Sequence, residues 1–163
     1  MMVSSTARPR SSLRRVARRA SVVLTTASLV AVFSGAKAAA PDGRFVLMDG
    51  DEVVHDTKTN LRWQRTATAQ TRSWNLSLQY CTALTLAGGG FRAPNIKELL
   101  TIVDWSVSTP PVFPTAYFDG PSGEYWASST PFQGSGDRHF VSFSTGEGGR
   151  SDGTSRYVRC VKP

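Results

Sequence analysis

The sequence has few of the residues from which reactive centres are built. Its 163 residues include only two cysteines, Cys81 and Cys160, and two histidines, His55 and His139. The histidines lack the spacing of metal ligands, so we expect them to be structural or to lie on the surface. No Gly-x-Ser-x-Gly motif occurs, and no serine has an evident base beside it. We therefore expect a protein that is not an enzyme and that uses no cofactor or metal.

The acidic segment Asp49-Gly50-Asp51-Glu52 is the one segment that suggests calcium. An EF-hand loop that began at Asp49 would need glycine at its sixth position and glutamate at its twelfth. Those positions hold Val54 and Asn60 instead. We therefore interpret the segment as a solvated turn.

Long apolar runs are also absent. The longest, Ala20 to Phe33, is shorter than the roughly 20 residues that a membrane-spanning helix needs. It follows a segment with six arginines and precedes Ala36-Lys37-Ala38, which has the layout of a signal-peptidase site. We expect residues 1–38 to be a signal peptide, cleaved after Ala38, and the mature chain to be secreted or periplasmic with no transmembrane segment. A basic tail that binds nucleic acid is the alternative, and the export route stays open.

The net charge of +7 belongs to this N-terminal segment. Residues 1–38 hold seven of the 19 basic residues and no acidic residue, so the rest of the chain carries 12 basic and 12 acidic residues. A basic protein often binds nucleic acid or an anionic surface. For the mature chain this inference fails, and we expect no nucleic-acid partner.

The mature chain has the length of one domain. We divide it into a linker, residues 39–43, and a domain, residues 44–163. Because an exported protein meets an oxidising compartment, its two cysteines are expected to form a disulfide, Cys81 with Cys160. Two free buried thiols are the alternative.

Residue patterns predict strands first, then two helices, a long loop and more strands. The first helix is predicted over 74–86 with Ser73 as N-cap and Cys81 on its buried face, which Trp74, Leu78 and Leu84 share. The second, from Asn95 to Val103, has a capping box with Glu98. Strands are predicted at 44–48, 124–129, 138–144 and 156–161, with a hairpin over 53–64 that turns through Asp56 and Asn60. The proline-rich loop covers 106–123, and turns are predicted at 134–136 and at Gly146, Gly148 and Gly149. This order predicts an α+β fold with two helices on a mostly antiparallel sheet.

Six short blocks of sequence carry a resemblance to a known family. They are Val54-His55-Asp56-Thr57 with Asn60-Leu61-Arg62-Trp63-Gln64, Trp74 with Tyr80-Cys81, Phe91-Arg92-Ala93-Pro94-Asn95-Ile96-Lys97-Glu98-Leu99, Tyr117-Phe118, Tyr125-Trp126-Ala127-Ser128-Ser129, and Tyr157-Val158-Arg159-Cys160-Val161. In this order, residues 44–162 resemble the C-terminal domain of the Legionella collagen-like (Lcl) adhesins. That family is similar to C-type lectins and, more distantly, to formylglycine-generating enzymes.

The resemblance implies a C-type-lectin-like fold in which a helix cysteine pairs with one in the last strand. It also implies a ligand region at about 104–136. The calcium-dependent sugar motif of lectins is missing, and Ala93-Pro94-Asn95, which looks similar to it, opens a helix instead. The collagen-like stalk of the adhesins is missing too. Formylglycine-type chemistry needs active-site thiols, which the expected disulfide occupies.

Trp105 is the strongest candidate for a ligand-stacking surface, with core packing as the alternative. Trp63, Trp74 and Trp126 are expected in the core, and Arg92 and Glu98 are expected to be structural. The candidates for hydrogen bonds to a polar ligand, which otherwise would be ordinary surface charges, are Asp119, Glu124, Asp137 and Arg138.

The leading functional hypothesis is an exported, adhesin-like binding module that recognises a glycan such as a glycosaminoglycan, another polyanion, or a surface protein. A structural or assembly subunit of the cell envelope is the alternative. An enzyme related to the formylglycine generators is the third hypothesis. The oligomeric state and any calcium dependence stay open.

Overall fold

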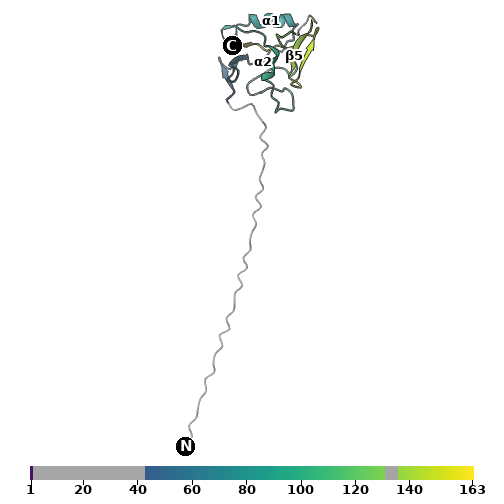
Figure 1. Cartoon of the computed structure of the whole chain (residues 1–163). Coiled ribbons are helices and arrows are strands. Elements are labelled where there is room, and N and C mark those ends of the chain that lie inside the picture. Colours follow the sequence, from purple (N-terminus) through teal and green to yellow (C-terminus); the bar gives the residue numbers. More distant parts are fainter. Residues whose placement is uncertain (2–42, 131–135) are drawn as a thin grey trace. The chain divides into compact units, whose positions relative to one another are not determined.

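The computed structural model describes Met1, residues 43–130 and residues 136–163 (Figure 1). The predicted signal peptide after Met1, all of the linker except Gly43, and most of the turn predicted at 134–136 lie outside these ranges. The described chain has two α-helices and two antiparallel sheets, so the predicted α+β class is confirmed. None of the helices in these ranges is long and apolar enough to cross a membrane.

The first sheet has the strand order β1-β2-β3-β7 and is antiparallel throughout. Its strands are β1 (Phe45–Met48), β2 (Val53–Asp56), β3 (Leu61–Gln64) and β7 (Val161–Lys162). The predicted hairpin is confirmed as β2–β3. Asn60 has a φ of 56°, and the Asp56 carboxylate accepts a hydrogen bond from the Lys58 amide at 3.0 Å. Because β7 pairs with β3, the sheet joins the start of the domain to its end.

The second sheet has the order β4-β5-β6, with strands β4 (Glu124–Trp126), β5 (Arg138–Ser142) and β6 (Gly148–Ser151). The prediction of a turn at Gly148 and Gly149 was wrong, because both residues belong to β6 and pair with β5. The Phe140 ring lies over Gly149 so closely that an added Cβ would sit 2.8–2.9 Å from two of its carbons, which leaves no room for a side chain at this position of the strand. The aromatic ring takes the place of the missing side chain.

The strand predicted at 156–161 was only partly right. Only Val161 and Lys162 form a regular strand, while Arg156 and Tyr157 make isolated bridges to Arg72 and to Tyr125 of β4. The segment passes from the second sheet at Tyr157 to the first sheet at Val161, and it links the two.

The helices are shorter than predicted. They are α1 (Trp74–Ala83), the 3₁₀ turn η1 (Leu86–Gly88) and α2 (Ile96–Thr101). Ser73 occupies the N-cap of α1 but makes no capping bond through its side chain; its carbonyl instead accepts from the Ser77 hydroxyl at 3.0 Å. The capping box of α2 is confirmed, since Asn95 and Glu98 bond reciprocally at 2.8 and 2.7 Å.

The predicted buried face of α1 is confirmed in part, because Cys81 is buried and Leu78 and Leu84 pack against its cluster. Its fully buried residues are Ser77 and Cys81, whereas Trp74, Leu78 and Leu84 are half-buried at its edge. The prediction that Trp63 and Trp126 lie in the core is confirmed. The half-buried Trp74 donates its indole hydrogen to the Ala127 carbonyl at 2.8 Å and so ties α1 to the segment after β4.

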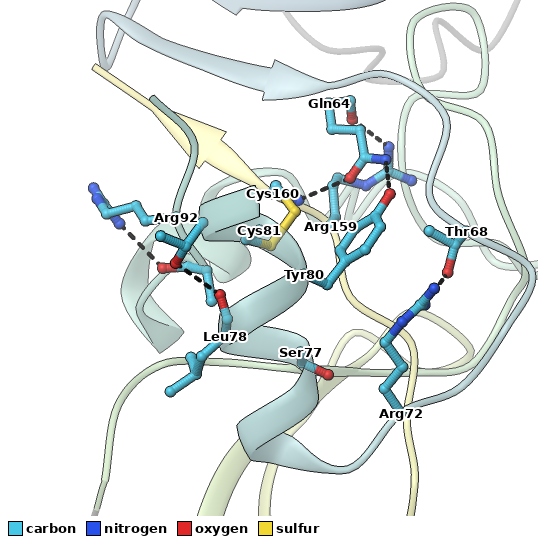
Figure 2. Close-up of a disulfide and its surroundings, with 12 residues drawn as sticks. Gln64, Thr68, Arg72, Ser77, Leu78, Tyr80, Cys81, Arg92, Arg159 and Cys160 are labelled. Atoms are coloured by element: carbon cyan, nitrogen blue, oxygen red, sulfur yellow. Dashed lines mark hydrogen bonds between the residues drawn. A yellow bond between two sulfur atoms is a disulfide. The ribbon is translucent and has the colours of Figure 1, made fainter. Parts of the chain in front are cut away.

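The predicted disulfide between Cys81 and Cys160 is confirmed (Figure 2). Beside it, the Gln64 amide accepts a hydrogen bond from the Cys160 backbone at 3.2 Å and donates one to the Tyr80 hydroxyl at 3.0 Å. The bridge and this amide together hold α1 against the segment that leads into β7.

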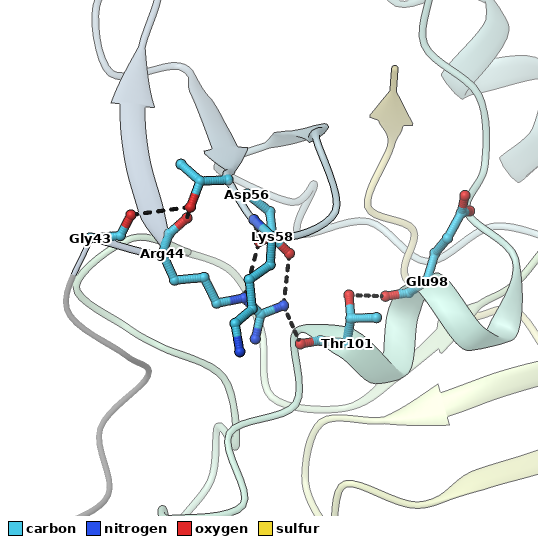
Figure 3. Close-up of polar contacts among 7 residues, drawn as sticks. Gly43, Arg44, Asp56, Lys58, Glu98 and Thr101 are labelled. Atoms are coloured by element: carbon cyan, nitrogen blue, oxygen red, sulfur yellow. Dashed lines mark hydrogen bonds and ion pairs between the residues drawn. The ribbon is translucent and has the colours of Figure 1, made fainter.

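Two ion pairs fix α2 at its ends. Arg44 bonds the fully buried Asp56 at 2.7 and 3.0 Å and also donates to the Thr101 carbonyl at 2.9 Å, which joins the first sheet to the end of α2 (Figure 3). At the start of α2, Arg92 pairs with Glu98 at 2.7 Å. Both Arg92 and Glu98 are therefore structural, as predicted.

Candidate functional site

The loop between α2 and β4 lines a cavity of about 480 Å³ that is open to solvent on one side. The cavity is lined by Asp104, Val107, Thr109, Pro110, Pro111, Phe113, Pro114, Thr115, Ala116 and Tyr117. Its size falls within the usual range of pockets that hold small ligands.

Backbone hydrogen bonds close this loop and attach it to the second sheet. The Asp104 amide donates to the Val112 carbonyl at 2.9 Å, and the Val112 amide donates to the Phe143 carbonyl just beyond β5 at 2.8 Å. Pro114 begins a further turn, because its carbonyl accepts from Tyr117 and Phe118, each at 3.0 Å. The cavity is thus framed by anchored backbone.

Local chemistry in the loop restricts it further. The Asp104 carboxylate atom Oδ1 accepts hydrogen bonds from the Ser106 amide at 3.0 Å and from the Ser106 hydroxyl at 2.6 Å, which is an Asx turn. Pro110, Pro111 and Pro114 have their φ angles fixed by their rings. A wall built this way loses little conformational entropy when a ligand binds.

Trp105 projects from the beginning of the loop, and 71% of its surface is exposed. The ring rests against Gly146, where an added Cβ would lie 2.9 Å from the Trp105 atom Cζ3. Gly146 also has a φ of +84°, which L-residues with side chains rarely adopt. The alternative that Trp105 packs in the core is therefore wrong. Its indole lies on the surface, with one edge supported by the turn after β5.

The other predicted ligand residues mostly make contacts within the domain. Glu124 forms an ion pair with the buried Arg156 at 2.7 Å. Asp119 has an exposed side chain, but its backbone bonds to Arg65 at 3.1 Å and to the Arg159 guanidinium at 2.9 Å. Asp119 and Glu124 therefore hold neighbouring segments together.

Arg138 and Asp137 lie at the start of β5. The Arg138 guanidinium donates to the Asp137 and Gly136 carbonyls at 2.9 and 2.8 Å and lies 4.4 Å from the Trp74 ring centre. Gly146, which supports Trp105, follows the other end of β5. The structure thus separates Arg138 from Trp105 by the length of β5.

A buried arginine supports the inner side of the loop. Arg159 is fully buried, and its guanidinium donates to the carbonyl of Gln64 (Figure 2). It also donates to the carbonyls of Arg65 and Asp119. The ring centres of Phe113, Phe118 and Tyr125 lie 5.0–5.8 Å from it. Phe113 also lines the cavity. The packing around Arg159 therefore fixes one wall of the site.

Burial shifts the titration of this group and of its neighbour. It lowers the pKa of Arg159 to about 10 and raises the pKa of Tyr125 to about 12. At neutral pH the guanidinium is therefore charged and the phenol is neutral. The Tyr125 hydroxyl donates to the Pro121 carbonyl at 2.7 Å. Both groups serve as fixed hydrogen-bond donors in the wall behind the loop.

Asp104 is the site residue that sequence reasoning missed. It was treated only as the beginning of the ligand region, whereas the structure places it in the cavity wall. The available signal was an aspartate two residues before a serine, at the beginning of a proline-rich loop, which is typical of an Asx turn.

The acidic turn at Asp49 is the segment whose sequence suggests calcium. The turn forms as predicted, with positive φ at Asp49, Gly50 and Asp51. Within residues 43–130 and 136–163, no group of three or more histidine, cysteine, aspartate or glutamate side chains is placed to hold a metal ion.

Comparison with known families gives one match. A family model described as the Lcl C-terminal domain matches residues 52–162, which include both cysteines, Trp105 and the whole loop. No curated protein and no solved structure matches the chain.

Proposed function

The chain belongs to the Lcl C-terminal domain family, and on that basis we propose that it is an exported, non-catalytic, adhesin-like binding module. It recognises a glycan, a polyanion or a protein surface. The contact face consists of Trp105 and the cavity framed by residues 104–117.

The exposed indole of Trp105 is the observation that carries this proposal. Tryptophan is usually well buried, and a tryptophan on a surface is typical of binding sites, where its large rigid ring contributes strongly to affinity. Trp105 is 71% exposed, yet it is held against Gly146. A ring that is both exposed and supported needs little ordering when it meets a ligand.

The disulfide supports a binding role over formylglycine-type catalysis. Such chemistry needs reactive thiols, and Cys81 and Cys160 are bonded to each other. Labelling the native, non-reduced protein with a thiol reagent tests this point. Incorporation of label into a folded protein would favour the enzyme.

A lectin-like architecture and export complete the proposal. The bridge from α1 to the segment before β7, together with the pairing of β7 with β3, supports a C-type-lectin-like fold. The hydrophobic run and the Ala-x-Ala site support export. Mass spectrometry of the protein expressed in a Gram-negative host should find a mature chain that begins at Ala39, whereas an uncleaved chain would contradict export by this signal.

An array of glycans, glycosaminoglycans and surface proteins, probed with and without calcium, tests the function. We expect reproducible binding to one class, lost in the Trp105→Ala variant and retained in Asp119→Ala and Arg138→Ala. Binding that survives Trp105→Ala but fails in Arg138→Ala would place the contact face at the start of β5 instead.

A further inference from the structure

The cavity in the 104–117 loop combines apolar walls with a single carboxylate. Its lining includes three prolines, Phe113 and Tyr117, and the acidic group is Asp104. The ion pairs of the described residues join Arg44 to Asp56, Arg92 to Glu98 and Arg156 to Glu124, so Asp104 takes part in none of them. This half-buried carboxylate therefore lies beside the cavity without a cationic partner from these parts of the chain.

The Asx turn fixes how this carboxylate is presented. Both hydrogen bonds from Ser106 go to Oδ1. Within residues 43–130 and 136–163, no hydrogen bond reaches Oδ2. One oxygen therefore anchors the side chain, and the other has its acceptor capacity free for a donor from outside.

These features select a ligand with a cationic head on an apolar stem. A carboxylate that is partly removed from water gains most from a charged donor, and proline and aromatic walls favour aliphatic groups. Lysine and arginine side chains have this construction. An anionic ligand would instead meet an uncompensated like charge.

We propose that the cavity binds a lysine or arginine side chain of a partner protein, with Asp104 as its counter-ion. This inference rests on the proposed binding function and specifies the class of ligand for one part of the contact face. The neighbouring exposed Trp105 gives a partner further surface to cover, which favours a side chain on a protein over a free amine.

Titrations followed by amide NMR spectra of the ¹⁵N-labelled protein test the inference. The probes are N-acetyl-lysine methylamide, its arginine analogue, and the norleucine analogue, which keeps the stem without the charge. We expect the two cationic probes to shift the amide signals of Asp104, Val107, Thr115 and Tyr117, with affinity that weakens as salt rises. Norleucine is expected to bind at least tenfold more weakly. Equal binding of norleucine, or no shift with any probe, would overturn the inference.

The Asp104→Asn variant separates charge from shape, because the amide oxygen can still accept the bonds from Ser106. We expect at least a tenfold loss of affinity for the cationic probes with an otherwise unchanged spectrum. Asp119→Asn is the matched control, since it removes an exposed carboxylate outside the cavity lining. An equal loss in both variants would show general charge attraction and would contradict a specific site.

The result of the NMR titrations is independent of the result of the array experiment. If Trp105→Ala leaves array binding intact while the lysine probe still depends on Asp104, the Trp105 contact face is wrong and the cavity assignment stands. If array binding depends on Trp105 but no cationic probe binds, the module stands and the ligand class is wrong.

Discussion

At the scale of single residues, Asp56 shows how one carboxylate can serve several elements. It is fully buried, and it bonds both the Arg44 guanidinium and the Lys58 amide (Figure 3). Burial alone would raise the pKa of Asp56, but the bonds from Arg44 and Lys58 outweigh it, so the pKa lies below its usual value. The charged form is therefore the one that stabilises the fold.

Replacing this residue by Asp56→Asn should lower the free energy of unfolding at pH 7 by about 3 kcal/mol, since Arg44 loses its partner. In the wild type the contribution is complete above the unfolded pKa, near 3.9, and is lost as pH falls through the lower folded value. The difference in the free energy of unfolding between wild type and Asp56→Asn, measured with urea, should thus be complete at pH 7 and narrow below about pH 4.

The exposed Asp152 is the matched control for this comparison. Asp152→Asn should change stability by less than about 0.5 kcal/mol at either pH. A gap between wild type and Asp56→Asn that stayed constant down to pH 2 would show that the carboxylate acts by shape and not by charge.

At the scale of elements, β6 depends on the absence of a side chain at Gly149. The Phe140 ring fills the space above Gly149, and the Arg156 guanidinium lies 4.1 Å from the centre of the same ring. Phe140 is therefore held between two neighbours and has little freedom to move aside.

A methyl group at this position should be costly. We expect Gly149→Ala to lower the free energy of unfolding by about 1–3 kcal/mol in chemical denaturation, because the new Cβ overlaps the ring. Gly153 has no atom within 4 Å of its hypothetical Cβ and no positive φ, so Gly153→Ala should be neutral or slightly stabilising. Equal effects of the two substitutions would mean that Phe140 does not pack on β6.

The elements that sequence reasoning predicted well are those that local chemistry specifies. Asp56 and Asn60 define the hairpin turn, and Asn95 with Glu98 defines the start of α2. Gly148 and Gly149 were predicted as a turn because glycine is typical of turns, whereas both pair with β5, and the Phe140 ring covers Gly149. Local patterns do not contain that tertiary contact.

The same limit applies to the site. The Trp105 ring lies against Gly146, which is 41 positions further along the chain. The charged candidates Glu124 and Arg138 were chosen by their proximity to the loop in sequence. The fold uses them for contacts with Arg156 and Trp74. Proximity in sequence could not show this, because their partners come from other elements.

At the scale of the whole molecule, the disulfide joins residues 79 positions apart and closes a loop that includes α2 and the 104–117 cavity. In the chain-entropy model a loop of this length contributes about 4–5 kcal/mol. The double variant Cys81→Ser, Cys160→Ser should therefore unfold at a much lower urea concentration. Reductant should destabilise the wild type to a similar extent and leave the double variant unchanged. A wild type that resists reductant without loss of stability would contradict this role.

The proposed binding function depends on Trp105 as the centre of the contact face. Leu76, on the exposed side of α1, is the matched control, because it is another exposed apolar side chain, at 54%, in a different element. The most direct measurement is the dissociation constant of the strongest array ligand for wild type, Trp105→Ala and Leu76→Ala by surface plasmon resonance. We predict that Trp105→Ala weakens the affinity about 30-fold, as at an interface hot spot, and that Leu76→Ala weakens it less than twofold. Unchanged affinity in a folded Trp105→Ala variant would contradict the proposed function.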